Sequence, residues 1–210
     1  MRRDVEIINC TGKSPASERN AALKKAKGKY IIFSDPSVSV DDEMTDRAVE
    51  ELEKTGAGMG VVGYDIADTD GGLLYETPES TRRVMERDDM LCRIFYQTHY
   101  QGFVWNKVFR LSVIKRHFLK FCEDIPGSEE MVFIVDYLKH CGDVVVLPDH
   151  YAHATAVPTA DIDLELLAYE RMRKKLRRFP DAQWLCETAL ELLEMEQMDM
   201  EDDGLYDEAQ

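Results

Sequence analysis

The amino-acid sequence predicts an α/β protein with a mostly parallel sheet. Helix and strand patterns alternate along residues 5–64, and three short apolar runs, at 30–33, 59–64 and 143–147, have the length of buried strands. Glycine, proline or polar residues flank each run. A helix that joins two parallel strands crosses over with a right hand, so this order restricts the topology of the sheet.

Residues 5–64 are predicted to form strand, helix, strand, helix and strand in that order. Ser17 is a candidate N-cap for the first helix, and Gly28 is a candidate left-handed residue at its end. Asp41 or Asp42 begins the second helix, which Gly56 stops. The three strands are expected at residues 5–9, 30–33 and 59–64.

Residues 65–150 lose this alternation. Aspartates and glycines at 68–72 lie between apolar flanks and predict a hairpin or a protruding loop over 65–76. A serine followed by two glutamates, with a Cys-Gly stop, predicts a helix over 128–140. The other expected elements are a helix at 81–96, an irregular strand at 102–109, a short helix at 112–116 and a buried strand at 143–147.

The last part of the chain is predicted to be helical. Two amphipathic helices, at 162–179 and 182–198, are separated by Pro180 and Asp181, and the acidic end is expected to be disordered. The expected organisation is therefore an α/β domain over residues 1–158, a helical hairpin packed on it over 159–198, and an acidic tail over 199–210.

Charge and composition restrict the class of protein. A formal net charge of -15 argues against a nucleic-acid binder, which needs concentrated positive charge. No apolar run approaches the roughly 20 residues that span a bilayer, and five cysteines without a C-x-x-C pair indicate free thiols in a reducing compartment. The basic run at 171–178 is more simply a solvated helix face than a contact for anionic lipid. We expect a cytoplasmic protein, either free or peripheral to the inner membrane face.

Asp35 is the first candidate functional residue. It follows the predicted strand at 30–33, and ligands of open α/β sheets gather beyond the carboxyl ends of strands. The alternative is a structural role, because an Asp-Pro pair is also typical of a turn.

Three segments extend this hypothesis. They are SERNAALKKAKGKYIIFSDPS at 17–37, VWNKVFR at 104–110 and GSEEMVFIVDYLKHCGDVVVLPD at 127–149. In this order they resemble the A-R-N-x-G-L-x-x-A-x-G-x-Y-I-x-F-L-D-x-D-D, W-N-K-L-Y-R and G-E-D-x-x-F segments of family 2 inverting glycosyltransferases, the type that builds bacterial capsular and cell-surface polysaccharides. The resemblance covers residues 5–150 and implies a three-layer nucleotide-diphospho-sugar transferase (GT-A) fold, shortened at its amino end, with C-terminal helices.

The resemblance also implies an activity and a set of site residues. Enzymes of this family transfer a sugar from a nucleotide-sugar donor to a glycan acceptor, with a dication beside the leaving diphosphate and a carboxylate that removes the acceptor proton. The implied base is Glu130 or Glu129, and the implied metal site is Asp35 with Ser37, for Mg²⁺ or Mn²⁺. The implied donor and sugar contacts are Arg19, Asn20, Asp35, Trp105, Asn106 and Lys107.

The sequence departs from the family pattern at several of these positions. Ser37 and Val38 stand where aspartates are expected, which predicts a weakened metal site, and Glu130 stands where the family has aspartate. The Pro-x-Tyr-Asn and Asp-Asp-Gly-Ser segments that hold the nucleotide have no counterpart before Val5. The alternative to a transferase is therefore a catalytically degenerate domain that binds a partner transferase or a glycan.

Several of these residues also have plain structural explanations. Trp105 is either a platform on which a sugar stacks or a side chain of the core. Glu129 can serve only to place a favourable negative charge at the start of a helix. His150 and His153 lie beside an aspartate, but their spacing argues against a metal cluster.

Overall fold

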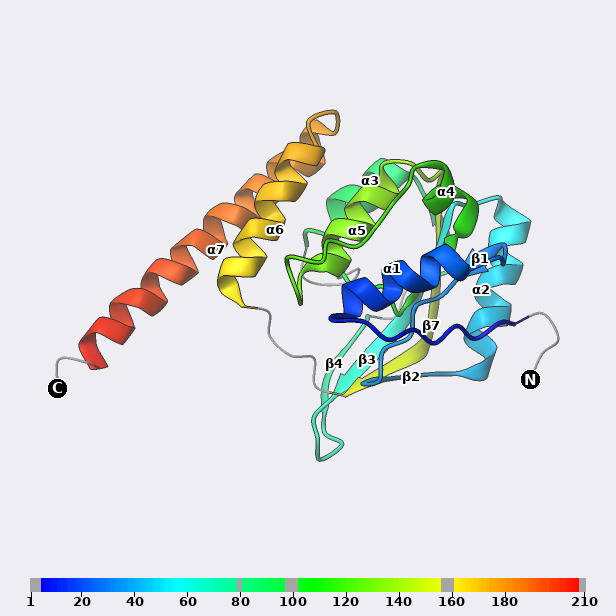
Figure 1. Cartoon of the computed structure of the whole chain (residues 1–210), viewed down its shortest axis with the longest axis horizontal. Helices are drawn as coiled ribbons and strands as arrows, with labels where there is room; N and C mark the ends of the chain where they lie inside the picture. The colour runs from blue at the N-terminus through cyan, green and yellow to red at the C-terminus, as the bar shows by residue number, and fades with distance from the viewer. Residues whose placement is uncertain (1–4, 79–80, 97–101, 156–160, 208–210) are drawn as a thin grey trace.

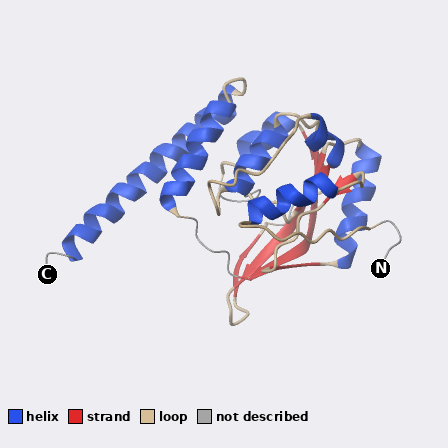
Figure 2. Cartoon of the chain, viewed as in Figure 1, coloured by secondary structure: helices blue, strands red, loops and turns tan. Residues whose placement is uncertain are grey.

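The computed structural model describes residues 5–78, 81–96, 102–155 and 161–207, with side chains up to Met200. The described strands form one seven-stranded sheet in the order β1-β6-β3-β7-β2, with β4 beside β3 and β5 beside β7. Helices cover the sheet, and two long helices lie to one side of it (Figure 1, Figure 2). The strands are β1 (Tyr30–Ile31), β2 (Val38–Val40), β3 (Met59–Ala67), β4 (Leu73–Glu76), β5 (Arg83–Met85), β6 (Lys107–Arg110) and β7 (Val144–Thr155). The helices are α1 (Pro15–Lys25), α2 (Asp42–Thr55), α3 (Arg87–Arg93), α4 (Leu111–Arg116), α5 (Glu129–Leu138), α6 (Ile162–Lys175) and α7 (Pro180–Asp207).

The sheet is mixed, so the α/β class is confirmed but the predicted mostly parallel pairing is wrong. β3 and β7 are parallel, and each follows a helix, as the alternating pattern predicted. The described pairings of β1 with β6, β2 with β7, β3 with β4, β3 with β6 and β5 with β7 are antiparallel. The β3–β4 hairpin closes through the turn at 68–72, as expected, and a tight turn of that length permits only antiparallel strands.

The sheet lies between two helical layers, which confirms the three-layer arrangement. On one face, the apolar side of α2 packs on Val62 and Val145. On the other face, a larger core joins α1, α3 and α5 to Val61 and Val144. Neighbouring residues of a strand point to opposite faces, so each of the two central strands serves both cores.

The ends of α1 differ from the prediction, whereas the end of α2 agrees with it. Ser14 is the N-cap of α1: its Oγ accepts a hydrogen bond from the Ser17 N–H (3.2 Å), and the Ser17 Oγ accepts one from the Ser14 N–H (3.0 Å). Ser17 is therefore the second partner of a capping box and not the cap itself. The helix ends at Ala26, before Gly28, whereas Gly56 follows α2 in the left-handed conformation with a φ of 72°.

Four further predictions fail in whole or in part, because tertiary contacts override the local pattern. The described residues 5–9 pair with no strand, and β1 leaves the sheet after Ile31. Residues 81–96 are not one helix, since β5 pairs with β7 before α3 begins. At 102–109 only the last three residues lie in a strand, the start of β6. The helices at 112–116 and 128–140 are confirmed as α4 and α5, each within about two residues.

The C-terminal helices form an antiparallel pair. α6 contacts α5, and α7 contacts α3 and α6, while the end of α7 projects beyond the rest of the protein (Figure 1). α6 ends at Lys175, earlier than predicted, and α7 continues through Asp207 where a disordered tail was expected from residue 199. In the part of the chain that the structure describes, no helix is both long and apolar enough to cross a membrane.

Candidate functional site

Two segments that lie far apart in the sequence meet at Arg19. This arginine is on α1 and is 9% exposed, and its Nη1 donates to Glu129 Oε1 at 2.9 Å. Its Nη2 pairs with Glu130 and lies 3.7 Å from Asp35 Oδ2. Both glutamates are in the first turn of α5, which Gly127 introduces with a φ of 90°. Arg19 therefore joins two of the three segments on which the family resemblance rests.

The two glutamates have different surroundings. Glu129 is 3% exposed, and its second oxygen accepts a hydrogen bond from the Gly127 N–H at 2.7 Å, so protein groups hold both of its oxygens. The Glu130 side chain is 16% exposed, and its Oε2 accepts a hydrogen bond from the Val104 N–H at 2.9 Å. Glu129 is therefore fixed in the interior, whereas Glu130 keeps access to solvent.

Burial raises the pKa of Glu130 above its ordinary value, although Arg19 and the Val104 N–H oppose the rise. The negative charges of Glu129 and Asp35 add to it. A carboxylate whose pKa is raised toward neutrality is a better proton acceptor than an exposed one. The position and pKa of Glu130 therefore suit a general base.

Asp35 lies in a self-contained turn. Its Oδ1 accepts hydrogen bonds from the Ser37 N–H (2.9 Å) and the Ser37 hydroxyl (2.7 Å), while Oδ2 faces Arg19. The turn aspartate anticipated from the Asp-Pro pair is thus present, together with the contact to the Arg19 cluster.

These groups do not form a protein-built site for Mg²⁺ or Mn²⁺. The two predicted ligands, Asp35 and Ser37, bond to each other and supply one carboxylate between them. The neighbouring carboxylates, Glu129 and Glu130, are directed to the guanidinium of Arg19. Among the residues that the structure describes, no three His, Cys, Asp or Glu side chains are grouped to hold a metal ion. The donor set therefore does not fit a resident dication, which prefers several oxygen ligands.

The predicted sugar contacts at 105–107 lie beneath the surface. Trp105 is 4% exposed and stacks on Phe103 with ring centroids 4.8 Å apart. Asn106 and Lys107 are fully buried, and the Asn106 amide donates to the Val62 carbonyl of β3. Trp105 lies in the core, which is one of the two roles expected for it, and the side chains of Asn106 and Lys107 are also buried; a sugar contact of these three residues stays a prediction.

Asn20 serves the loop that precedes α5. Its amide donates to the Phe121 carbonyl and to Glu123, and its oxygen accepts a hydrogen bond from the Phe121 N–H at 2.9 Å. The predicted donor-side role does not match these contacts, because they satisfy both ends of the amide. Asn20 instead fixes the loop against α1, and the Arg19 guanidinium lies over the Phe121 ring, 5.4 Å from its centroid.

An aromatic cluster that the sequence pattern did not reveal supports the site. Phe33, two residues before Asp35, makes edge-to-face contacts with Phe109, Phe121 and Phe133 at centroid distances of 5.1–5.8 Å. These rings come from each of the segments that surround the Arg19 cluster. The one sequence signal for this cluster is Phe33, which ends the apolar run at 30–33 and by itself indicates only a strand.

The buried amine of Lys107 should make the stability of the protein depend on pH. Burial lowers its pKa to about 7, although the Glu130 carboxylate opposes this shift. An unfolded lysine keeps its proton to about pH 10.4, so between pH 7 and 9 the unfolded state binds more protons and stability rises with pH. Chemical denaturation at four pH values should give a contribution of up to about 1.4 kcal/mol per pH unit, which Lys107→Met removes. Lys29→Met, at a side chain 61% exposed, is the control; equal slopes in wild type and Lys107→Met would contradict the prediction.

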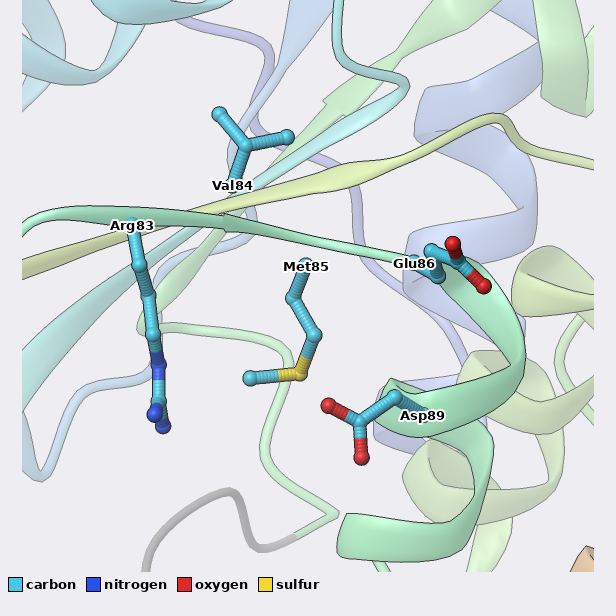
Figure 3. Close-up of a pocket in the computed structure, with 5 residues that line it drawn as sticks. All are labelled: Arg83, Val84, Met85, Glu86 and Asp89. Atoms are coloured by element: carbon cyan, nitrogen blue, oxygen red, sulfur yellow. The ribbon is translucent and has the colours of Figure 1, made fainter.

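The remaining histidine and pocket features lie apart from this cluster. His150 bonds to the Thr77 carbonyl, and His153 pairs with Asp65 at 2.6 Å. A pocket of about 330 Å³ is lined by Arg83, Val84, Met85, Glu86 and Asp89, with Arg83, Met85 and Asp89 toward one side (Figure 3). None of the predicted site residues lines it.

Comparisons with known proteins agree with the sequence resemblance. The family model described as Glycosyl transferase family 2 matches residues 1–118. The chain is 24% identical over 147 residues to the "Uncharacterized glycosyltransferase EpsJ" of Bacillus subtilis (strain 168), which covers 69% of this chain and 43% of that protein.

Solved structures give the same result for the fold. S. aureus TarS 1–349 in complex with UDP aligns with a TM-score of 0.63 at 19% identity, covering 78% of this chain and 46% of that one. The complex of the same protein with UDP-GlcNAc aligns with a TM-score of 0.64 at 18% identity, covering 78% and 47%. The fold is therefore of the GT-A type, and the chain spans less than half the length of these relatives. Because the family model matches more than half of its residues, the chain belongs to glycosyl transferase family 2.

Proposed function

We propose that this chain transfers a sugar from a nucleotide-sugar donor to the hydroxyl of a glycan acceptor, with Glu130 as the base. The observation that carries this proposal is the meeting of Arg19, Glu130 and Asp35, which brings two of the segments that resemble the transferase family together around one partly exposed carboxylate of raised pKa. Cell-surface glycan is the acceptor class that the resemblance implied.

In the proposed reaction the acceptor oxygen forms a bond to the anomeric carbon as the bond from that carbon to the diphosphate oxygen breaks. The acceptor proton passes to Glu130, and the leaving nucleoside diphosphate keeps the electron pair. Glu130 is suited to this task because one oxygen is held by the Val104 N–H and the other by Arg19, which orients the carboxylate before substrate arrives. Arg19 also opposes the rise in the pKa of Glu130 that burial causes.

The remaining groups have supporting roles. Glu129 holds Arg19 from the interior, so a change there acts on the position of the guanidinium. Asp35 Oδ2 lies 3.7 Å from the same guanidinium, so Asp35 helps to position Arg19, the cation of the cluster. No step is assigned to a metal ion, because the donor set does not fit one.

Turnover of nucleotide sugars tests the proposal. The similar structures of TarS are complexes with UDP and with UDP-GlcNAc. UDP-GlcNAc is therefore the first donor to try, followed by other UDP-, GDP- and dTDP-sugars. We expect release of nucleoside diphosphate from one of these donors when a saccharide acceptor, or water, receives the sugar. A folded protein that releases nucleotide from no donor, with and without Mn²⁺, would contradict catalysis by this chain.

A second candidate function is a non-catalytic domain that binds a partner transferase or a glycan. The observation that favours it is that the polar groups of the cluster bind one another: Arg19 pairs with Glu129 and Glu130, and Asp35 bonds to Ser37. Such a domain would show no turnover, yet would be retained on a glycan column or by the partner enzyme.

A carboxylate at position 37 should restore part of the expected metal site. Ser37→Asp places a second carboxylate beside Asp35, which should tighten Mn²⁺ binding by about tenfold because hard dications prefer charged oxygen ligands. Ser112→Asp adds the same charge at an exposed position on α4 and is the matched control. Calorimetric titration of both variants checks the result; equal Mn²⁺ affinity in the two would mean that the Asp35 turn offers no place for a metal.

A further inference from the structure

Lys107 is a buried lysine whose charge is coupled to that of Glu130. Its side chain is fully buried, and its Nζ donates to the Phe103 carbonyl at 2.6 Å and to the Asn106 Oδ1 at 2.8 Å. Burying a charged lysine is costly, and ordinary core packing would be served by an apolar residue. The cation therefore calls for an explanation beyond packing.

The contacts of Lys107 define the shape of the turn at 103–106. Besides the two side-chain bonds, its N–H donates to the Val104 carbonyl, and the Asn106 amide anchors the turn to Val62 of β3. The ammonium group thus ties the beginning of the turn to its end, with β3 as the fixed support.

The same turn presents the Val104 N–H to Glu130. That N–H donates to Glu130 Oε2 at 2.9 Å, while Arg19 takes the other oxygen. A shift of the turn would misplace one of the two donors that orient the carboxylate. Lys107 therefore supports the backbone N–H that binds Glu130, and its own side chain is shielded from solvent.

Charge links the two residues as well. The Glu130 carboxylate favours the charged form of Lys107, and by reciprocity the ammonium favours the ionised form of Glu130. The charged groups that act on Glu130 are its neighbour Glu129 on α5, Arg19 of α1 and Asp35 after β1, and Arg19 is the one cation among these three. Lys107 supplies a second positive charge from the sheet side.

We propose that Lys107 is a positioning residue for Glu130: it holds the turn that offers the Val104 N–H, and its positive charge favours the ionised form of the carboxylate. The proposal rests on the proposed function only in calling Glu130 the base. A neutral amine keeps two N–H donors for Phe103 and Asn106, so loss of the proton removes the charge and leaves the turn. The two contributions can therefore be measured separately.

The test is a ¹³C NMR titration of the Glu130 carboxyl from pH 4 to 8, assigned by its loss in Glu130→Gln. In wild type we expect two inflections, one from Glu130 itself and one near pH 7, the pKa of Lys107. In Lys107→Met the second inflection should disappear and the first should move up by about one pH unit, since a neighbouring cation is lost. One inflection in wild type, or the same midpoint in Lys107→Met, would overturn the proposal.

Kinetics provide an independent arm. With a donor that turns over, Lys107→Met should lower kcat at least tenfold near pH 6 with little change in KM, and move the acidic limb of the pH profile upward, whereas Lys107→Arg should keep that limb in place. A purely structural role would lower the amount of folded enzyme without moving the limb. If no donor turns over, the NMR result still decides the role of Lys107, and the proposed function alone fails.

Discussion

Replacing Glu130 with glutamine is expected to lower the rate of sugar transfer by about 10²- to 10⁴-fold, the usual contribution of a general base. Glutamine has nearly the same shape and can still accept the hydrogen bond from the Val104 N–H, but it cannot take a proton. The loss should appear in kcat for nucleotide release, while the dissociation constant for the nucleoside diphosphate stays within a few fold.

Glu129→Gln is the matched control for this experiment. The residue is the sequence neighbour, pairs with the same arginine and is buried, so its amide variant should lower stability more than Glu130→Gln. Corrected for the folded fraction, its rate should fall by less than about tenfold, since it offers no exposed oxygen to an acceptor. A larger loss of rate in Glu129→Gln than in Glu130→Gln would show that Glu130 is not the base.

Replacing Arg19 with methionine is expected to destabilise the protein by about 3–5 kcal/mol, the usual cost of leaving one partner of a buried ion pair behind. Arg19 is the shared partner of Glu129 and Glu130, whose side chains are 4% and 16% exposed. Such a loss is comparable with the whole stability of a small domain. Urea denaturation at pH 7 measures it.

The pH dependence of this loss identifies its cause. Arg19 holds the raised pKa of Glu130 down, so its removal raises that pKa further. A carboxyl whose pKa is raised on folding costs stability as pH rises through that pKa, and the penalty of Arg19→Met should therefore shrink on acidification from pH 7 toward 5. Arg93→Met breaks an exposed pair with Asp89 and should cost only about 0.5 kcal/mol. Equal costs in the two variants would show that the Arg19 cluster carries no buried charge.

Local pattern was sufficient to predict the elements that present the site. The helix ending near residue 25, the apolar run after it and the turn with Asp35 all follow from residue types within about twenty positions. The start of α5 at the two glutamates could also be predicted, because serine, acidic residues and a preceding glycine are local signals.

The geometry of the cluster could not be predicted in this way. Arg19 and Glu129 are 110 residues apart, and their contact depends on how α1 and α5 pack on the same face of the sheet. The direction of β6 and the strand β5 are set by pairing with β3 and β7, against a local pattern that favoured a helix at 81–96. The burial of Trp105 and Asn106 likewise depends on Tyr64 and Val62, which come from a distant segment.

A nucleoside diphosphate titration, followed by thermal unfolding, tests the central claim most directly. If the Arg19–Glu130 cluster belongs to a nucleotide-sugar site, UDP at 100 times its dissociation constant should stabilise the wild-type chain by about 2.7 kcal/mol, or a rise in Tm of about 5–10 °C. GDP and dTDP are measured alongside it, each with and without Mn²⁺, and Arg19→Met should lose the shift. No rise in Tm with any of the three at millimolar concentration, in a protein that unfolds cooperatively, would contradict the account.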